Sequence, residues 1–134
     1  MVAAMPTDHP LALTPRIGLA DLAEETFIFY RRPTGPGLYD AIMSACLAAG
    51  FSPQVGQEAP RMSSTLGLVA SGLGVAIVPA AMARMNMEGV AFATLAGAPA
   101  LTAPLMLATR RQERASLVQR FRQDVIEAAA SQAP

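Results

Sequence analysis

The sequence of 134 residues lacks much of the chemistry that enzymes and nucleic-acid-binding modules use. It has one histidine, one cysteine and no tryptophan, and ten basic residues balance ten acidic ones to a net charge of zero. A nucleic-acid-binding module normally carries a clear positive excess, so DNA and RNA are poor candidates as direct partners. Because there is no second imidazole, a metal site lacks ligands, and we expect neither a metal nor another cofactor.

Long hydrophobic runs and sorting signals are also missing. No run of about 18 apolar residues is free of helix breakers, so no membrane span is expected. The first six residues lack the basic stretch of a secretory signal peptide. The single cysteine, Cys46, excludes an internal disulfide and suits a reducing compartment. We therefore expect a cytoplasmic protein without membrane contact.

The residues that are present predict an α/β fold. Apolar residues make up 52% of the chain, enough for a real core. Apolar and β-branched runs predict strands at residues 2–5, 26–30, 53–57, 75–78, 90–94 and 104–109. Helical spacing predicts helices at residues 19–25, 38–49, 63–73 and 117–126. This alternation indicates βαβ units in a mainly parallel sheet, with residues 27–30, 54–57 and 75–78 in one sheet.

Catalytic groups are scarce. A nucleophile pair of Cys46 and His9 is formally available, but Cys46 falls on the apolar face of a predicted helix, which favours an inert packed thiol. The glycines at positions 35 and 37 are not followed by the Gly-Lys-Ser/Thr of a phosphate loop. We expect no enzyme activity.

The most informative segment runs from residue 57 to residue 64, from a strand end into a helix start. Free amides and the helix dipole favour an anion there, and Arg61 could add charge. Arg31 follows the buried strand that ends at Tyr30, and arginine suits bidentate carboxylate contacts. The alternative is an ordinary helix capped by Ser63 or Ser64 and a solvated loop arginine. Spacing alone leaves both open.

Several stretches resemble LysR-type transcriptional regulators. The Asp-His-Pro-Leu-Ala stretch at residues 8–12, with residues 19–23 and 27–28, is similar to the entry to the second lobe of that family's effector-binding domain. Residues 66–79 carry the most specific match, a helix that breaks at Gly-x-Gly into a strand ending in proline. Residues 48–53 and the tail at 105–129 also fit, so the resemblance covers nearly all of the chain.

The resemblance implies a fold like the type 2 periplasmic binding proteins, in which two α/β lobes hold a small effector between them. Residues 12–97 would form a complete second lobe. Residues 1–11 would be a strand and crossover of the first lobe, and residues 98–134 its returning strand and C-terminal helix. The family's winged helix-turn-helix, linker helix and opening of the first lobe have no counterpart here, so DNA contact is expected only through a missing N-terminal domain.

The same resemblance implies an effector-sensing domain of a bacterial transcription regulator. The ligand would be a small carboxylate; an aromatic acid is a candidate, because the residues around 57–58 are similar to regulators of aromatic-acid catabolism. The candidate ligand-binding residues are Tyr30, Arg31, Gln57, Glu58, Pro60, Arg61, Met62, Ser63 and Ser64.

Three alternatives remain from the sequence: a solute-binding protein, an enzyme on the same fold, or a truncated subunit that acts only as an oligomerisation module. Self-association, as a dimer, is expected in any case. An incomplete first lobe would leave the strands at 2–5 and 105–109 with unpaired edges. It would also uncover the inner face of the last helix at Leu117, Phe121 and Val125.

Overall fold

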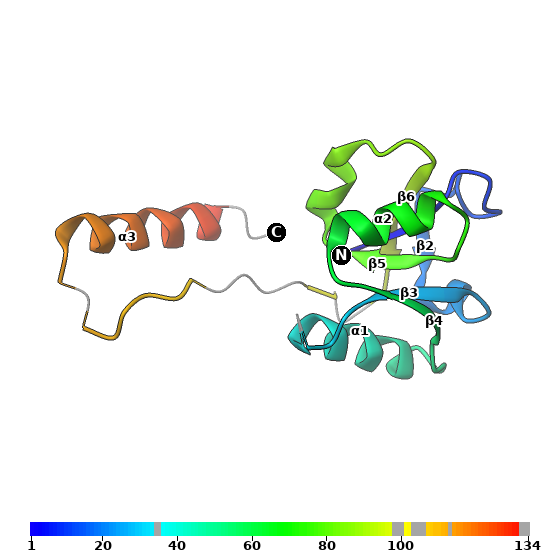
Figure 1. Ribbon diagram of the computed structural model, residues 1–134, viewed down its shortest axis with the longest axis horizontal. Coiled ribbons are helices and arrows are strands. Elements are labelled where there is room, and N and C mark those ends of the chain that lie inside the picture. The colour runs from blue at the N-terminus through cyan, green and yellow to red at the C-terminus, as the bar shows by residue number, and fades with distance from the viewer. Residues whose placement is uncertain (34–35, 98–100, 103–106, 113, 132–134) are drawn as a thin grey trace. The chain divides into compact units, whose positions relative to one another are not determined.

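The computed structural model describes residues 1–33, 36–97, 101–102, 107–112 and 114–131 (Figure 1). The chain divides into two compact units, Met1–Ala103 and Pro104–Pro134. The strands of the first unit are β1 (Val2–Pro6), β2 (Arg16–Gly18), β3 (Thr26–Tyr30), β4 (Gln54–Ala59), β5 (Ala76–Val78) and β6 (Val90–Ala96). Its helices are η1 (Leu19–Leu22), α1 (Pro36–Ala48), α2 (Met62–Ala70) and η2 (Ala80–Met85), and the second unit contains α3 (Ser116–Ser131).

The described strands of the first unit form two sheets, and most of them run in one direction. Four of them pair in the order β2-β6-β1-β5, and β3 pairs with β4. A parallel bridge between Phe27 and Val75 joins the two sets: the Val75 amide donates to the Thr26 carbonyl, and the Ile28 amide to the Val75 carbonyl, each at 2.8 Å. Since β1 is antiparallel to both β5 and β6, the other five described strands all run the same way. This confirms the expected mainly parallel sheet.

The prediction that residues 27–30, 54–57 and 75–78 share one sheet is wrong in detail. β5 belongs to the four-stranded sheet and touches β3 only at the Phe27–Val75 bridge. The reason is that β5 is three residues long and is paired along its length with β1. Only Val75, the residue before β5, reaches β3.

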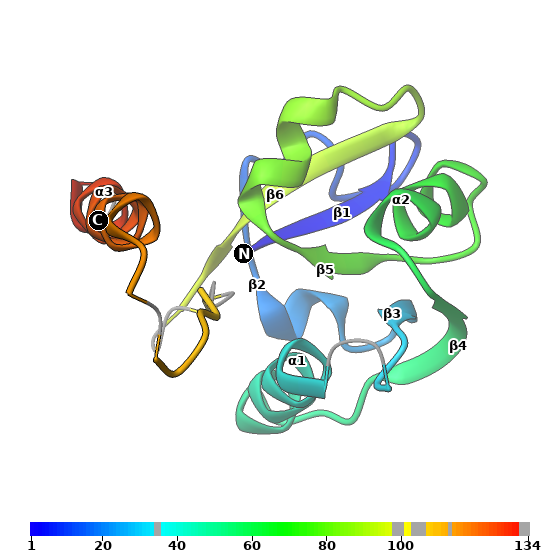
Figure 2. The ribbon, with the colours of Figure 1, turned by 60° about the vertical axis from the view of Figure 1, so that its left-hand side comes forward.

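Two apolar layers form on opposite faces of these strands. Phe27 and Phe29 belong to the buried cluster that includes Ile42 of α1. Ile28, which lies between them, belongs to the cluster that includes Leu66 of α2. Successive side chains of a strand point to opposite faces, so β3 is buried on both. Figures 1 and 2 show α1 and α2 on either side of β3 and β4.

Strand β1, which was expected to belong to a first lobe, lies within the first unit of the chain. β1 is paired along both edges, with β5 and with β6, inside the unit Met1–Ala103. Ala3, Ala4 and Met5 have no solvent exposure. A strand with an apolar residue toward each face and a partner on each edge belongs in the interior of a sheet, so β1 offers no free edge.

The first unit continues past the end of β6. The N-terminal amine of Met1 donates a hydrogen bond of 3.1 Å to the Leu101 carbonyl, and the first unit ends at Ala103. Of the strand expected at 104–109, residues 104–106 lie outside the described part of the chain, and residues 107–109 form no strand. The expected final helix is confirmed as α3. No helix in the described ranges has both the length and the hydrophobicity to span a bilayer.

Candidate functional site

The carboxyl ends of β3 and β4 bring two of the candidate segments together. Tyr30 pairs with Ala59 at the end of the parallel ladder, and the Arg31 amide donates to the Ala59 carbonyl at 3.1 Å. Tyr30 and Arg31 therefore lie beside the turn through Pro60 that leads into α2.

The start of α2 has no side-chain cap. Arg61 occupies the N-cap position with an extended backbone (φ −139°, ψ 148°), and its carbonyl accepts hydrogen bonds from the Thr65 amide and hydroxyl at 3.0 and 3.2 Å. The expectation that Ser63 or Ser64 caps the helix is wrong, because the helix already begins at Met62 and both serines lie in its first turn. The amides of that turn have no intrahelical acceptor, so they can donate to an anion.

The arginines at this edge of the sheet differ in their partners. Arg32 forms an exposed ion pair with Asp40 (Nε to Oδ1, 2.9 Å), and the hydrogen bond that Arg32 donates to the Asp40 carboxylate raises the pKa of Arg32. Its guanidinium also lies 5.9 Å from the centre of the Tyr39 ring. Arg31 and Arg61 are exposed and form no ion pair with any described residue. Their charges are available to a ligand, whereas that of Arg32 is engaged.

The remaining candidates lie in β3, in β4 and at the start of α2. Tyr30 and Met62 are half-buried and offer apolar surface. The exposed candidates are Gln57, Glu58, Pro60, Ser63 and Ser64.

The strand order adds one segment that the sequence reasoning missed. From β3 the chain passes through α1 to β4 on one side, whereas from β5 it passes through η2 to β6 on the other. Neighbouring strands whose connections diverge form a crevice at their carboxyl ends, where ligands of open α/β sheets bind. Pro79 and Ala80 follow the carboxyl end of β5, which runs parallel to β3. The strand-ending proline of the 66–79 motif was the available signal.

Two hollows in the structure lie away from these residues. A hollow of about 660 Å³ begins where β2 and β6 end and extends along α1. Its lining residues are Gly18, Leu19, Ala20, Ala41, Ser44, Ala45, Ala48, Ala49, Leu95, Ala96, Gly97, Leu101 and Thr102. None of them is ionisable, so this surface offers no charge to a carboxylate.

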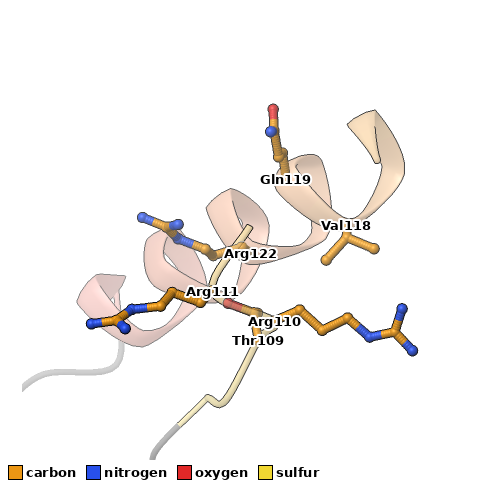
Figure 3. A pocket seen from close by; sticks show the side chains of 6 residues that line it. All are labelled: Thr109, Arg110, Arg111, Val118, Gln119 and Arg122. Atoms are coloured by element: carbon orange, nitrogen blue, oxygen red, sulfur yellow. The ribbon is translucent and has the colours of Figure 1, made fainter. Parts of the chain in front are cut away.

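A smaller hollow of about 220 Å³ lies within the second unit, between residues 109–111 and α3 (Figure 3). It is lined by Thr109, Arg110, Arg111, Val118, Gln119 and Arg122. Arg111 and Arg122 point to one side and Arg110 to the other. The three guanidinium groups therefore do not converge on one point.

The Cys46–His9 nucleophile pair does not form. Cys46 is fully buried, and burial raises the pKa of its thiol to about 11. His9 accepts a hydrogen bond from the Leu11 amide at Nδ1, and its Nε2 lies 3.2 Å from Glu25 Oε1. The prediction of an inert packed thiol is confirmed. The described residues also contain no group of three His, Cys, Asp or Glu side chains that could hold a metal.

Comparisons with known proteins agree with this architecture. The sequence profile of the LysR substrate binding domain matches residues 1–130. The uncharacterized HTH-type transcriptional regulator YnfL of Escherichia coli K12 is 33% identical over 122 residues, which cover 91% of this chain and 41% of YnfL. The regulator CatR of Pseudomonas putida is 35% identical over 120 residues, which cover 90% of this chain and 41% of CatR. The chain thus spans about two fifths of the length of these relatives.

Solved structures show the same fold. The BenM effector binding domain with its effector benzoate aligns with a TM-score of 0.74 at 23% identity, over 99% of this chain and 62% of that one. The effector binding domain of QuiR in complex with shikimate aligns with a TM-score of 0.65 at 19% identity, over the same shares. The relatives are transcriptional regulators and not enzymes. The profile match covers nearly all of the chain, and the relatives and the fold agree with it. The chain therefore belongs to the LysR family of transcriptional regulators and represents its substrate-binding domain, which has the type 2 periplasmic-binding-protein-like fold.

Proposed function

We propose that the chain senses a small carboxylate effector at the carboxyl ends of β3 and β4. One observation carries the proposal. The two strands end side by side at the uncapped start of α2, and Arg31 and Arg61 there have no ion-pair partner among the described residues. A carboxylate that leaves water needs hydrogen-bond donors and positive charge in its place. The free amides at the start of α2 and the two guanidinium groups can supply both.

Each candidate residue has a role in this proposal. Arg61 and Arg31 bind the carboxylate, together with the first-turn amides of α2. Tyr30 and Met62 contact the apolar body of the ligand. Gln57, Glu58, Pro60, Ser63 and Ser64 line the remaining edge and contribute to selectivity.

The ligand class draws support from the solved structures. Benzoate, bound to BenM, and shikimate, bound to QuiR, are both small ring carboxylates. We extend this chemistry to the present chain as an aromatic or otherwise cyclic acid. For the whole protein we propose that the effector lies between two lobes, that DNA is contacted through an N-terminal helix-turn-helix, and that the site of action is the cytoplasm.

The test uses the full chain and measures melting temperature and calorimetric affinity with benzoate and shikimate. The neutral analogue benzamide serves as the ligand control. A bound carboxylate should raise the melting temperature, and benzamide should not. Arg61→Ala should weaken binding about 10- to 100-fold, the worth of one charge-assisted hydrogen bond. Arg31→Ala should act in the same direction.

The matched control is Arg84→Ala, since Arg84 is also exposed but lies in the last turn of η2. It should bind as the parent chain does. Unchanged affinity in both Arg61→Ala and Arg31→Ala, for a carboxylate that does bind, would show that the site lies elsewhere.

A further inference from the structure

Among the candidate ligand-binding residues, Glu58 alone carries a negative charge. It is exposed and pairs with Phe29 in the parallel ladder, one residue before Ala59. The Ala59 carbonyl accepts the hydrogen bond from the Arg31 amide, so Glu58 and Arg31 lie at the same end of β3 and β4. Neither Glu58 nor Arg31 forms an ion pair with any residue that the structure describes.

The alternation of side chains along the strands places Glu58 and Arg31 on the same face. Paired residues of a parallel ladder project to one side, and successive residues of a strand alternate between the two sides. Phe29 belongs to the buried cluster that includes Ile42 of α1, so its partner Glu58 lies on the α1 side. Arg31, two residues after Phe29, returns to that side. A ligand carboxylate bound by Arg31 therefore has Glu58 as a neighbouring charge.

The charges at this end of the two strands leave one positive charge in surplus. Arg32 and Asp40 neutralise each other in their ion pair. Of the candidate residues without an ion pair in the described part of the chain, Arg31 and Arg61 are positive and Glu58 is negative. One ligand carboxylate balances this surplus. A second carboxylate on the same ligand would approach Glu58, which has the same sign, without a further candidate arginine to receive it.

We propose that Glu58 makes the site select acids with a single negative charge and discriminate against dicarboxylates. The inference rests on the proposed effector site and specifies the charge of its ligand. Arg31 and Arg61 attract any carboxylate, whereas Glu58 repels the second carboxylate of a dianion. Two like charges about 8 Å apart near a protein surface repel each other by an energy that changes affinity about 3- to 30-fold.

The test measures calorimetric affinities of the full chain for benzoate, terephthalate and 4-carbamoylbenzoate. The last is the matched ligand control, because its amide has nearly the size of the second carboxylate of terephthalate but no charge. The parent chain should bind benzoate and 4-carbamoylbenzoate, and it should bind terephthalate about 3- to 30-fold more weakly than 4-carbamoylbenzoate. In about 1 M salt, where charges are screened over about 3 Å, the affinities for these two ligands should become nearly equal.

Glu58→Gln should remove the discrimination, because glutamine keeps the shape of glutamate without its charge. Relative to 4-carbamoylbenzoate, the affinity for terephthalate should rise by about the same 3- to 30-fold. The matched control variant is Glu88→Gln. Glu88 is also exposed and forms no ion pair with a described residue, but it precedes β6, at the opposite ends of the parallel strands. This variant should keep the parent ratio of affinities, and circular dichroism checks that both variants fold.

Two outcomes would overturn the inference and leave the effector site in place. One is a parent chain that binds terephthalate as tightly as 4-carbamoylbenzoate. The other is a ratio of these affinities that Glu58→Gln does not change, or that Glu88→Gln changes equally, which would trace the effect to the net charge of the chain. If none of the three acids binds the parent chain, the proposed effector site fails together with this inference.

Discussion

Gly74 lies in close contact with the backbone of Thr26, and replacing Gly74 should separate β3 from β5. Gly74 has a φ of +145°, and a Cβ built on it would lie 2.3 Å from the Thr26 carbonyl oxygen. That oxygen accepts the hydrogen bond from the Val75 amide, which is half of the bridge between β3 and β5. Gly74→Ala therefore combines a disfavoured backbone conformation with a clash against backbone that cannot rotate away.

The size of the effect follows from these two causes. Backbone strain of this kind costs about 1–3 kcal/mol, and overpacking in a tight interior costs a similar amount. Together they predict a loss of about 2–6 kcal/mol in the free energy of unfolding, a large part of the roughly 5–15 kcal/mol that domains have. Urea and thermal denaturation followed by circular dichroism measure it.

Two other glycines give the matched controls. Gly72 has a φ of +75° but open space around its Cβ position, so Gly72→Ala should cost only the conformational penalty of about 1–2 kcal/mol. Gly67 lies within α2, also with open space, so Gly67→Ala should stabilise by up to about 1 kcal/mol. If Gly74→Ala has a free energy of unfolding equal to or greater than that of Gly72→Ala, the close contact between Gly74 and the Thr26 carbonyl does not have the predicted effect.

Two further predictions concern the core. Phe27 is 1% exposed, and its ring centre lies 6.1 Å from that of Phe29 and 6.0 Å from that of Phe51. Phe27→Ala should therefore lower the free energy of unfolding by about 3–5 kcal/mol, measured by denaturation. Val55→Ala, on the exposed face of β4, should change it little. Burial raises the pKa of the Cys46 thiol from 9.0 to about 11, so the folded state favours the protonated thiol. The contribution of this thiol to the stability of the fold should be complete below pH 9.0 and should be lost as the pH rises toward 11. A thiol reagent should label Cys46 only after unfolding, and rapid labelling of the native chain at neutral pH would contradict this assignment.

Elements set by local pattern could be predicted from the sequence. The apolar run at residues 26–30 forms β3, which is buried on both faces. Ile42 and Cys46, four residues apart, lie on the inner face of α1. Gly50, with a φ of +92°, follows the end of that helix, where glycine favours the left-handed backbone that stops a helix. In each case the signal lies within a few residues of the structure it specifies.

Elements set by contacts between distant segments could not be predicted. β1 pairs with residues more than 70 positions away, and no short-range spacing records that choice. Leu73 fitted the period of α2 but is 49% exposed, because the helix ends at Ala70 and the chain turns through Gly72 and Gly74. The ion pair of Arg32 with Asp40 depends on how α1 leaves β3, so the sequence could not distinguish Arg32 from the unpaired Arg31.

The geometry of the candidate site depends on a detail at the other end of the same strands. The ladder between β3 and β4 shifts register between Phe27 and Ile28, which leaves Gly56 as the extra residue in β4. A Cβ at Gly56 would lie 2.3 Å from Thr26 Cγ2, so only glycine fits that bulge without a shift in its neighbour. Without the extra residue, Tyr30 would face Glu58 instead of the buried Ala59, and the start of α2 would move one position along β3. The extra residue at Gly56 thus determines which residue of β4 pairs with Tyr30 and accepts the hydrogen bond from the Arg31 amide. The glycines are visible in the sequence. Their effect on the site depends on the contacts that β4 and the segment before β5 make with Thr26 of β3, and no local pattern in the sequence predicts these contacts.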